Sequence, residues 1–163
     1  MAAVPIYQTP ILAEWIDYNG HLRDAYYTLI VSLATDALMD RVGLDAAYRA
    51  RSGCTLYTLE MHLHFLREIK QQDTALVELR VLGVDHKRIH AAFDILRRGE
   101  SGVAASAELM LLHVRQDGAK AGSTPFPGEV AAALAALEAQ SANATLAAPG
   151  SRRIEMPGQR RTP

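Results

Sequence analysis

Cysteine is almost absent from this sequence, since Cys54 is the only one among 163 residues. No disulfide can form within the chain, and one copy cannot assemble a cysteine-based metal cluster. An excess of positive charge is also lacking, because the formal net charge at pH 7 is -1. Nonspecific nucleic-acid binding depends on such an excess, so no nucleic-acid partner is expected. The cysteine usage fits a reducing compartment, and we expect a cytoplasmic location.

Long apolar runs are missing as well. No stretch reaches the roughly 18 uninterrupted apolar residues of a membrane-spanning helix. Residues 1–10 also lack the basic cluster and apolar run of a signal peptide. We therefore expect neither export nor a membrane partner. Apolar residues still make up 49% of the chain and charged residues 21%, which is the balance of a globular protein with one core.

The apolar residues that are present first recur at helical spacing. A stripe at three- and four-residue intervals predicts a helix from Asp24 to about Val42, with Asp24 as its N-cap. The stripe is expected to contain Tyr26, Ile30, Leu33, Ala37 and Leu38, with Ala25 and Leu29 beside them. Gly43 ends this helix, and Asp45 is expected to cap a short second helix through Arg51.

Farther along, apolar and polar residues alternate, which predicts a long strand beginning after Gly53. Tyr57 and Phe65 fall on its apolar face, where we expect them to pack in the core. The opposite face carries the polar groups Glu60, His62 and His64. Three such groups suggest a metal site, but a flat strand face rarely brings three ligands to one ion. We favour a solvated or subunit-contacting face, and no metal is expected.

Three more alternating segments predict strands at 74–84, 88–97 and 103–115. The short connections between them favour antiparallel pairing. Residues 6–16 fit an irregular or edge strand around Pro10, which cannot donate to a ladder. An Ala-rich segment predicts a helix at 129–140. Residues 1–140 are thus expected to form one domain, and residues 141–163, which are poor in large apolar residues, a flexible tail.

These elements predict an α+β fold. A sheet with an alternating pattern needs a partner for its apolar face, and the long helix is the available partner. A long central helix wrapped by a curved antiparallel sheet of five or so strands is the arrangement called the hotdog fold.

The segment from Trp15 to Tyr27 resembles the active-site signature of hotdog-fold thioesterases, which is Asp-x-Asn-x-His followed by a small polar pair and a Tyr. Asp17, Asn19, His21 and Tyr27 stand at the spacings of that signature, whereas Asp24 stands where many relatives have Asn. The segment is similar to the 4-hydroxybenzoyl-CoA and acyl-carrier-protein thioesterase branches of the superfamily.

The resemblance extends more weakly over residues 5–116. Within the superfamily, the stretch that includes Asp36 to Asp40 is most similar to thioesterases of carnitine breakdown, which act on betainyl-CoA. This resemblance implies an acyl-CoA thioesterase that needs no cofactor. It also implies a homodimer or homotetramer with the site between subunits.

The position of Asp17 suits hydrolysis of a thioester. It precedes a helix N-terminus, where unpaired backbone N–H groups and the helix dipole gather. An ionised Asp beside a thioester carbonyl can act as a general base or as a nucleophile, and both roles remain open. The amides of Gly20, His21 and Leu22 are candidate donors to the developing oxyanion. By itself Asp17 would more often only cap the helix, but Asn19 and His21 beside it favour the catalytic interpretation.

The neighbours of Asp17 have two interpretations each. His21 either binds the substrate carbonyl or orients Asp17, although a lone loop histidine is usually neither. Asn19 either holds the loop shape or contacts substrate. Four aromatic residues of this span are candidates for a cage around a quaternary ammonium group, namely Trp15, Tyr18, Tyr26 and Tyr27. For Trp15 and Tyr26, core packing is at least as plausible.

Two other functions remain open on the same fold. A non-catalytic acyl-CoA sensor would bind the thioester without releasing free thiol, although no DNA-binding extension supports a regulator. A dehydratase would usually show a His-plus-carboxylate arrangement on the helix, which the pair Asp17 and Asn19 does not provide.

Overall fold

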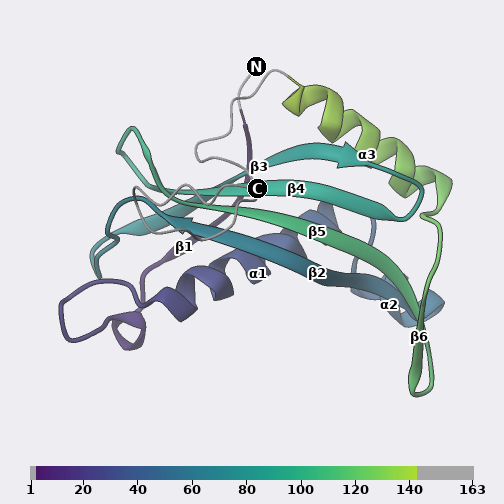
Figure 1. Cartoon of the computed structure of the whole chain (residues 1–163), viewed down its shortest axis with the longest axis horizontal. Helices are drawn as coiled ribbons and strands as arrows, with labels where there is room; N and C mark the ends of the chain where they lie inside the picture. Colours follow the sequence, from purple (N-terminus) through teal and green to yellow (C-terminus); the bar gives the residue numbers. More distant parts are fainter. Residues whose placement is uncertain (1–2, 143–163) are drawn as a thin grey trace, which may run out of the picture.

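The computed structural model describes residues 3–142, so most of the predicted tail, 141–163, lies outside the described residues. The described chain has six strands and three α-helices (Figure 1). The strands are β1 (Val4–Pro10), β2 (Cys54–Phe65), β3 (Thr74–Val84), β4 (Arg88–Arg97), β5 (Val103–Asp117) and β6 (Lys120–Ser123). The helices are α1 (Asp24–Arg41), α2 (Ala46–Ser52) and α3 (Gly128–Ser141), with a short 3-10 helix, η1, at Ala13–Trp15.

All strand pairs are antiparallel, and the strands follow the order β1-β3-β4-β5-β2, with β6 paired to the end of β5. In Figure 1, α1 runs along one side of the curved strands, and α3 lies near β3 on the other side. The hotdog arrangement of one long helix against a curved antiparallel sheet is confirmed. The predicted bounds of β3 and β4 are also confirmed, whereas β6 was not predicted.

The predicted stripe of α1 is partly wrong. The buried residues of this helix are Tyr27, Ile30, Val31, Ala34, Thr35, Leu38 and Met39. Leu29 is instead exposed, and Tyr26 is only half-buried, with its ring stacked on the buried Trp15. Apolar residues occur on more than one side of this helix, so periodicity alone did not fix its rotation.

Of the two predicted helix caps, one is confirmed and the other is wrong. Asp45 does cap α2, since its Oδ1 accepts the N–H of Tyr48 at 2.7 Å. Asp24 is not the N-cap of α1, because the helix begins at Asp24 and Arg23 occupies the cap position without a side-chain hydrogen bond. None of the helices within residues 3–142 is long and apolar enough to cross a membrane.

A buried ion pair crosses the middle of the sheet. Arg80 Nη1 lies 2.7 Å from Asp94 Oδ2, and the two residues are 4% and 2% exposed. Ser106 Oγ donates to the other oxygen of Asp94 at 2.7 Å. Burial raises the pKa of nearby Glu78, and the charge of Asp94 raises it further. This cluster is a polar link between β3, β4 and β5.

Strand β2 is less buried than its alternation predicted. Tyr57 and Phe65 are 37% and 54% exposed, so their assignment to the core was wrong. A bulge between Thr58 and Glu60 interrupts the alternation. β2 is also the last strand in the sheet order, and its outer edge has no strand partner within residues 3–142. The exposed apolar residues therefore gather along a free edge.

Candidate functional site

The loop before α1 closes on Asp17. Asp17 Oδ1 accepts the backbone N–H of Asn19 at 2.8 Å and that of His21 at 3.1 Å. The Asp17 backbone completes the turn, since its N–H donates to His21 O and its carbonyl accepts from Gly20 N. Gly20 adopts a φ of 81°, a conformation that other residues rarely adopt, which explains a glycine at this position.

These contacts keep Asp17 ionised. The N–H of His21 lowers the pKa of the Asp17 carboxyl, while partial burial raises it and the amide of Asn19 lowers it again. The net direction is downward, so the carboxylate carries its charge at neutral pH. That is the protonation state that either a general base or a nucleophile requires.

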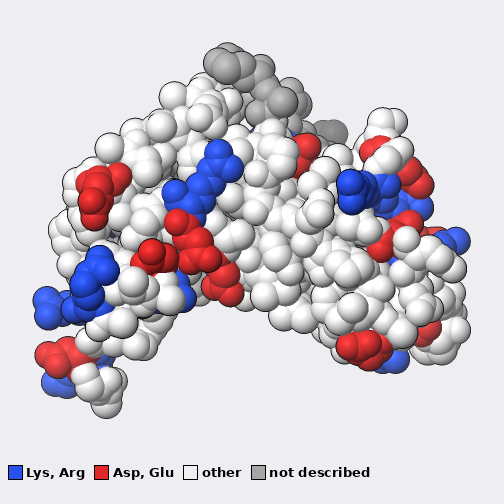
Figure 2. Space-filling model, turned by 180° about the vertical axis from the view of Figure 1, so that it is seen from behind, with Lys and Arg blue, Asp and Glu red and all other residues white. Residues whose placement is uncertain are grey.

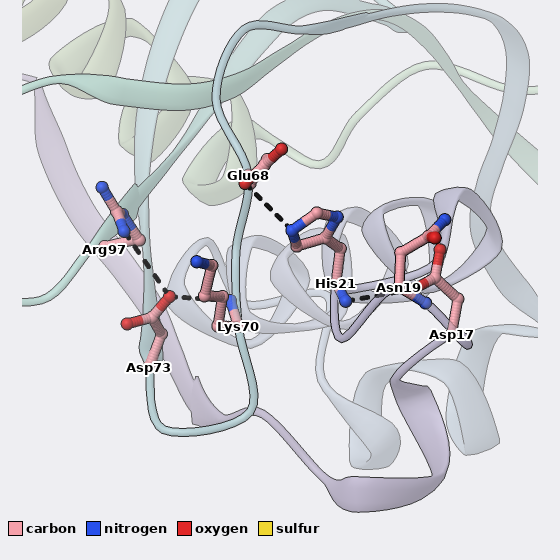
Figure 3. Close-up of polar contacts among 7 residues, drawn as sticks. All are labelled: Asp17, Asn19, His21, Glu68, Lys70, Asp73 and Arg97. Carbon is pink, nitrogen blue, oxygen red and sulfur yellow. Dashed lines mark hydrogen bonds and ion pairs between the residues drawn. The ribbon is translucent and has the colours of Figure 1, made fainter.

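His21 connects this loop to the segment that follows β2. Its Nε2 lies 3.0 Å from Glu68 Oε2. The backbone makes the same connection, because Leu22 N donates to Ile69 O at 2.8 Å. Figure 3 shows His21 with Glu68 on one side and with Asn19 and Asp17 on the other. Sequence reasoning missed Glu68, because no local pattern relates it to a loop far away along the chain.

The turn beyond Glu68 is held by a second set of polar contacts. Asp73 Oδ2 accepts the backbone N–H of Lys70 at 2.8 Å and lies 3.9 Å from Arg97 Nη1 (Figure 3). His21 and Lys70 also form an isolated antiparallel bridge. The segment that carries Glu68, after β2, is therefore fixed against the loop that carries Asp17.

The three amides predicted as oxyanion donors are already engaged within the chain. Gly20 N donates to Asp17 O, His21 N to Asp17 Oδ1 and Leu22 N to Ile69 O. In the first turn of α1, Ala25 N donates to Asp24 Oδ1 and Tyr26 N to Arg23 O. The amide of Asp24 makes no hydrogen bond within residues 3–142, so it is the available donor at this helix start.

A cavity of about 340 Å³ opens beside this helix start. Its walls come from the beginning of α1, with His21, Leu22, Asp24 and Tyr27, and from residues 65–68 after β2. Asp17 is not one of the lining residues and lies beyond His21 (Figure 3). Within one copy of the chain, the cavity therefore brings together His21, Asp24 and Glu68.

Only one of the four predicted cage aromatics borders the cavity. Tyr27 lines it and meets Phe65 edge to face, with ring centroids 5.1 Å apart and planes at 83°. Trp15 is buried and stacks on Tyr26, with centroids 5.4 Å apart. Tyr18 is 94% exposed. Phe65, which the strand pattern assigned to the core, is thus the second aromatic wall of this cavity.

The polar face of β2 forms a pair rather than a metal cluster. His62 Nε2 lies 2.8 Å from Glu60 Oε1. Within residues 3–142, no group of three or more His, Cys, Asp or Glu side chains has a geometry able to hold a metal ion.

Acidic and basic side chains are mixed over the face seen in Figure 2, and neither sign gathers into one broad patch. This distribution agrees with the formal net charge of -1.

The family match and the sequence relatives of this chain agree with one another. Residues 11–134 match the model of the thioesterase-like superfamily. The betainyl-CoA thioesterase of Pseudomonas aeruginosa is 50% identical over 131 residues, which are 80% of this chain and 81% of the relative. An L-carnitine dehydrogenase/betainyl-CoA thioesterase of Agrobacterium fabrum is 40% identical over 67% of this chain, which matches only 22% of that longer protein.

Solved structures give the same result. A structure from Pseudomonas putida KT2440, described as a candidate thioesterase, has a TM-score of 0.82 and 42% identity, covering 96% of this chain and 99% of the other. A hypothetical protein from Staphylococcus aureus, solved in complex with CoA, also has a TM-score of 0.82, with 25% identity over 96% of this chain and 98% of its own.

Proposed function

Because this chain belongs to the thioesterase-like superfamily, we propose that it is an acyl-CoA thioesterase that hydrolyses betainyl-CoA to betaine and CoA. The observation that carries the proposal is the 50% identity to a betainyl-CoA thioesterase over about four-fifths of both chains. The CoA complex of a structural relative supports binding of the CoA portion on this fold. The proposal locates the enzyme in the cytoplasm, in agreement with its single cysteine.

The proposed site lies at the start of α1. The thioester carbonyl accepts a hydrogen bond from the Asp24 amide, where the helix dipole also favours developing negative charge. Asp17 lies beyond His21 and not in the cavity wall, so the proposal requires the carbonyl to bind on the loop side of α1. Asp17 then acts in one of two ways. As a general base it takes a proton from the attacking water, and as a nucleophile it forms an acyl intermediate that water hydrolyses. In both cases the C–S bond breaks and the CoA sulfur gains a proton.

The remaining predicted residues have supporting roles in this proposal. Asn19 shapes the loop by donating its backbone N–H to Asp17. His21 positions that carboxylate in the same way, and its ring is held by Glu68. Gly20 and Leu22 contribute through the turn and through the bond to Ile69. Substrate contact by Trp15, Tyr18 and Tyr26 stays a prediction, whereas Tyr27 is supported by its place in the cavity wall.

The proposal includes a homodimer formed along β2. This strand has a free edge, and Leu59, Phe65 and Leu66 are 55%, 54% and 46% exposed along it and just beyond its end. An unpaired edge with exposed apolar residues is a template for another strand, and a second copy supplies one in a self-complementary pairing. Such pairing brings a partner subunit toward the side of the cavity formed by residues 65–68.

The experiment that tests the function is a thiol-release assay over a panel of CoA thioesters that includes betainyl-CoA. We expect steady release of free thiol from betainyl-CoA, faster than from long acyl chains. The alternative, a non-catalytic sensor, predicts saturable binding of the same esters without thiol release. That result would contradict the enzymatic function and would leave the fold assignment unaffected.

A further inference from the structure

The cavity at the start of α1 carries more negative than positive side chains. Asp24 lies on the α1 side and Glu68 on the opposite side, after β2. Among the residues that line the cavity, Arg67 is the one whose side chain carries a permanent positive charge. Its Nη1 donates to Ser101 O at 3.3 Å, so the guanidinium is directed toward the turn between β4 and β5. Gly102 permits this placement, since a Cβ there would lie 2.3 Å from Arg67 Nη1.

This charge balance matters because of where the proposed substrate carries its own charge. In a betainyl thioester, the quaternary nitrogen is bonded to the carbon next to the carbonyl. A carbonyl at the Asp24 amide therefore brings a full positive charge to the N-terminus of α1. The helix dipole makes that end partly positive and opposes a cation there. The carboxylates of Asp24 and Glu68 supply the compensating negative charge.

The other walls suit a trimethylammonium group. Such a group has no N–H to donate, so it is recognised by nearby negative charge and by aromatic faces rather than by hydrogen bonds. Tyr27 and Phe65 provide two rings at a steep angle to each other in the same wall. Phe65 is 54% exposed, so its ring is accessible from the cavity.

We infer that Asp24 and Glu68 are specificity-determining residues that select a cationic acyl group against a neutral one of the same shape. This inference rests on the proposed function. The two carboxylates act through charge at a distance, and the exposed ring of Phe65, held edge to face against the buried Tyr27, provides the surface against which the methyl groups pack.

The test compares betainyl-CoA with 3,3-dimethylbutyryl-CoA, which replaces the quaternary nitrogen by carbon and keeps the shape. The variants are Asp24→Asn and Glu68→Gln. Each preserves its local hydrogen bonding, since Asn can still accept from Ala25 N and Gln can still accept from His21. For each variant, the ratio of kcat/KM for betainyl-CoA to kcat/KM for the neutral ester should fall by about tenfold, as for the loss of one nearby charge in a partly solvated site. Any loss that both esters share, because Asp24 and Glu68 also contact the loop and His21, cancels in this ratio.

The chain offers a matched control in Glu60→Gln. The His62–Glu60 pair has side-chain exposures of 31% and 66%, against 31% and 62% for His21–Glu68, but it lies away from this cavity. This variant should keep the wild-type ratio of the two esters. A ratio that stays at the wild-type value in Asp24→Asn and Glu68→Gln, with betainyl-CoA still hydrolysed, overturns the inference alone. Thiol release from neither ester by the wild type overturns the proposed function and the inference together.

Discussion

Two turn aspartates, Asp17 and Asp85, have almost the same local structure and different surroundings. Each accepts two backbone N–H groups on its Oδ1 from residues that follow it in the chain. The donors are Asn19 and His21 for Asp17, at 2.8 and 3.1 Å, and Lys87 and Arg88 for Asp85, at 2.9 and 2.6 Å. A sequence pattern that predicts this bonding therefore predicts a turn and does not identify a catalytic residue.

The second oxygen separates the two carboxylates. Asp85 Oδ2 binds the guanidinium of Arg88, with Nε and Nη2 both at 2.7 Å. Asp17 forms no ion pair within residues 3–142. The charge of Asp85 is thus compensated within a hairpin, whereas the charge of Asp17 remains available beside the start of α1. The proposed role of Asp17 requires such an uncompensated carboxylate, which Asp85 does not offer.

The largest expected effect on activity comes from replacing Asp17, the uncompensated carboxylate of the pair. Asp17→Asn should lower thiol release from betainyl-CoA by about 10²- to 10⁴-fold, because the amide can neither accept the proton of water nor attack the carbonyl. Steady-state assays on folded protein measure the loss. The matched variant Asp85→Asn should leave turnover near the wild-type value. Equal losses in the two variants would mean that the substitutions act through turn structure, not through chemistry.

A buried carboxylate extends the comparison to stability. Asp94→Ala should lower the free energy of unfolding by about 3–5 kcal/mol, because it removes the carboxylate that pairs with Arg80 Nη1 inside the sheet. Urea unfolding measures the change, and Ser106→Ala, which removes one hydrogen bond to Asp94, should cost only about 1 kcal/mol. A small loss in Asp94→Ala, no greater than in Ser106→Ala, would contradict the assignment of this pair as a structural link.

The smallest effect concerns the pH dependence of Asp85. The amide of Lys87 and then the side chain of Arg88 lower the pKa of its carboxyl from 3.8 to about 2. A carboxyl whose pKa is lower in the folded protein stabilises the fold above its unfolded pKa. That contribution is lost as the pH falls through the folded value. The difference in melting temperature between wild type and Asp85→Asn should therefore be constant near neutrality and shrink below about pH 4. A difference that grows on acidification would contradict the bonding described.

Much of the fold was predictable from sequence, because strand alternation and turn residues are local signals. The bounds of β3 and β4 and the Asp45 cap followed from them. The rotation of α1 did not, since the helix buries Tyr27 and Val31 and leaves Tyr26 only partly buried, where it stacks on Trp15, a contact that periodicity does not encode. The prediction that Phe65 packs in the core was wrong for a related reason. Its exposure depends on β2 being the last strand of the sheet, which the local alternation does not encode.

The site was predictable only where its residues adjoin in the sequence. The loop from Asp17 to His21 could be found because its spacing resembles a known signature. The positive φ of Gly20 also explains why this turn has a glycine. Glu68 could not be found, because it reaches His21 through the tertiary fold. The engagement of the Gly20, His21 and Leu22 amides likewise became visible only with the backbone bonds in place.

The most direct test of the central claim is a crystal structure of Asp17→Asn with intact betainyl-CoA. The account predicts the thioester oxygen within hydrogen-bond distance of the Asp24 amide, with the side chain of residue 17 facing the carbonyl carbon. A thioester bound elsewhere on the molecule, or residue 17 turned away from the bound carbonyl, would contradict it.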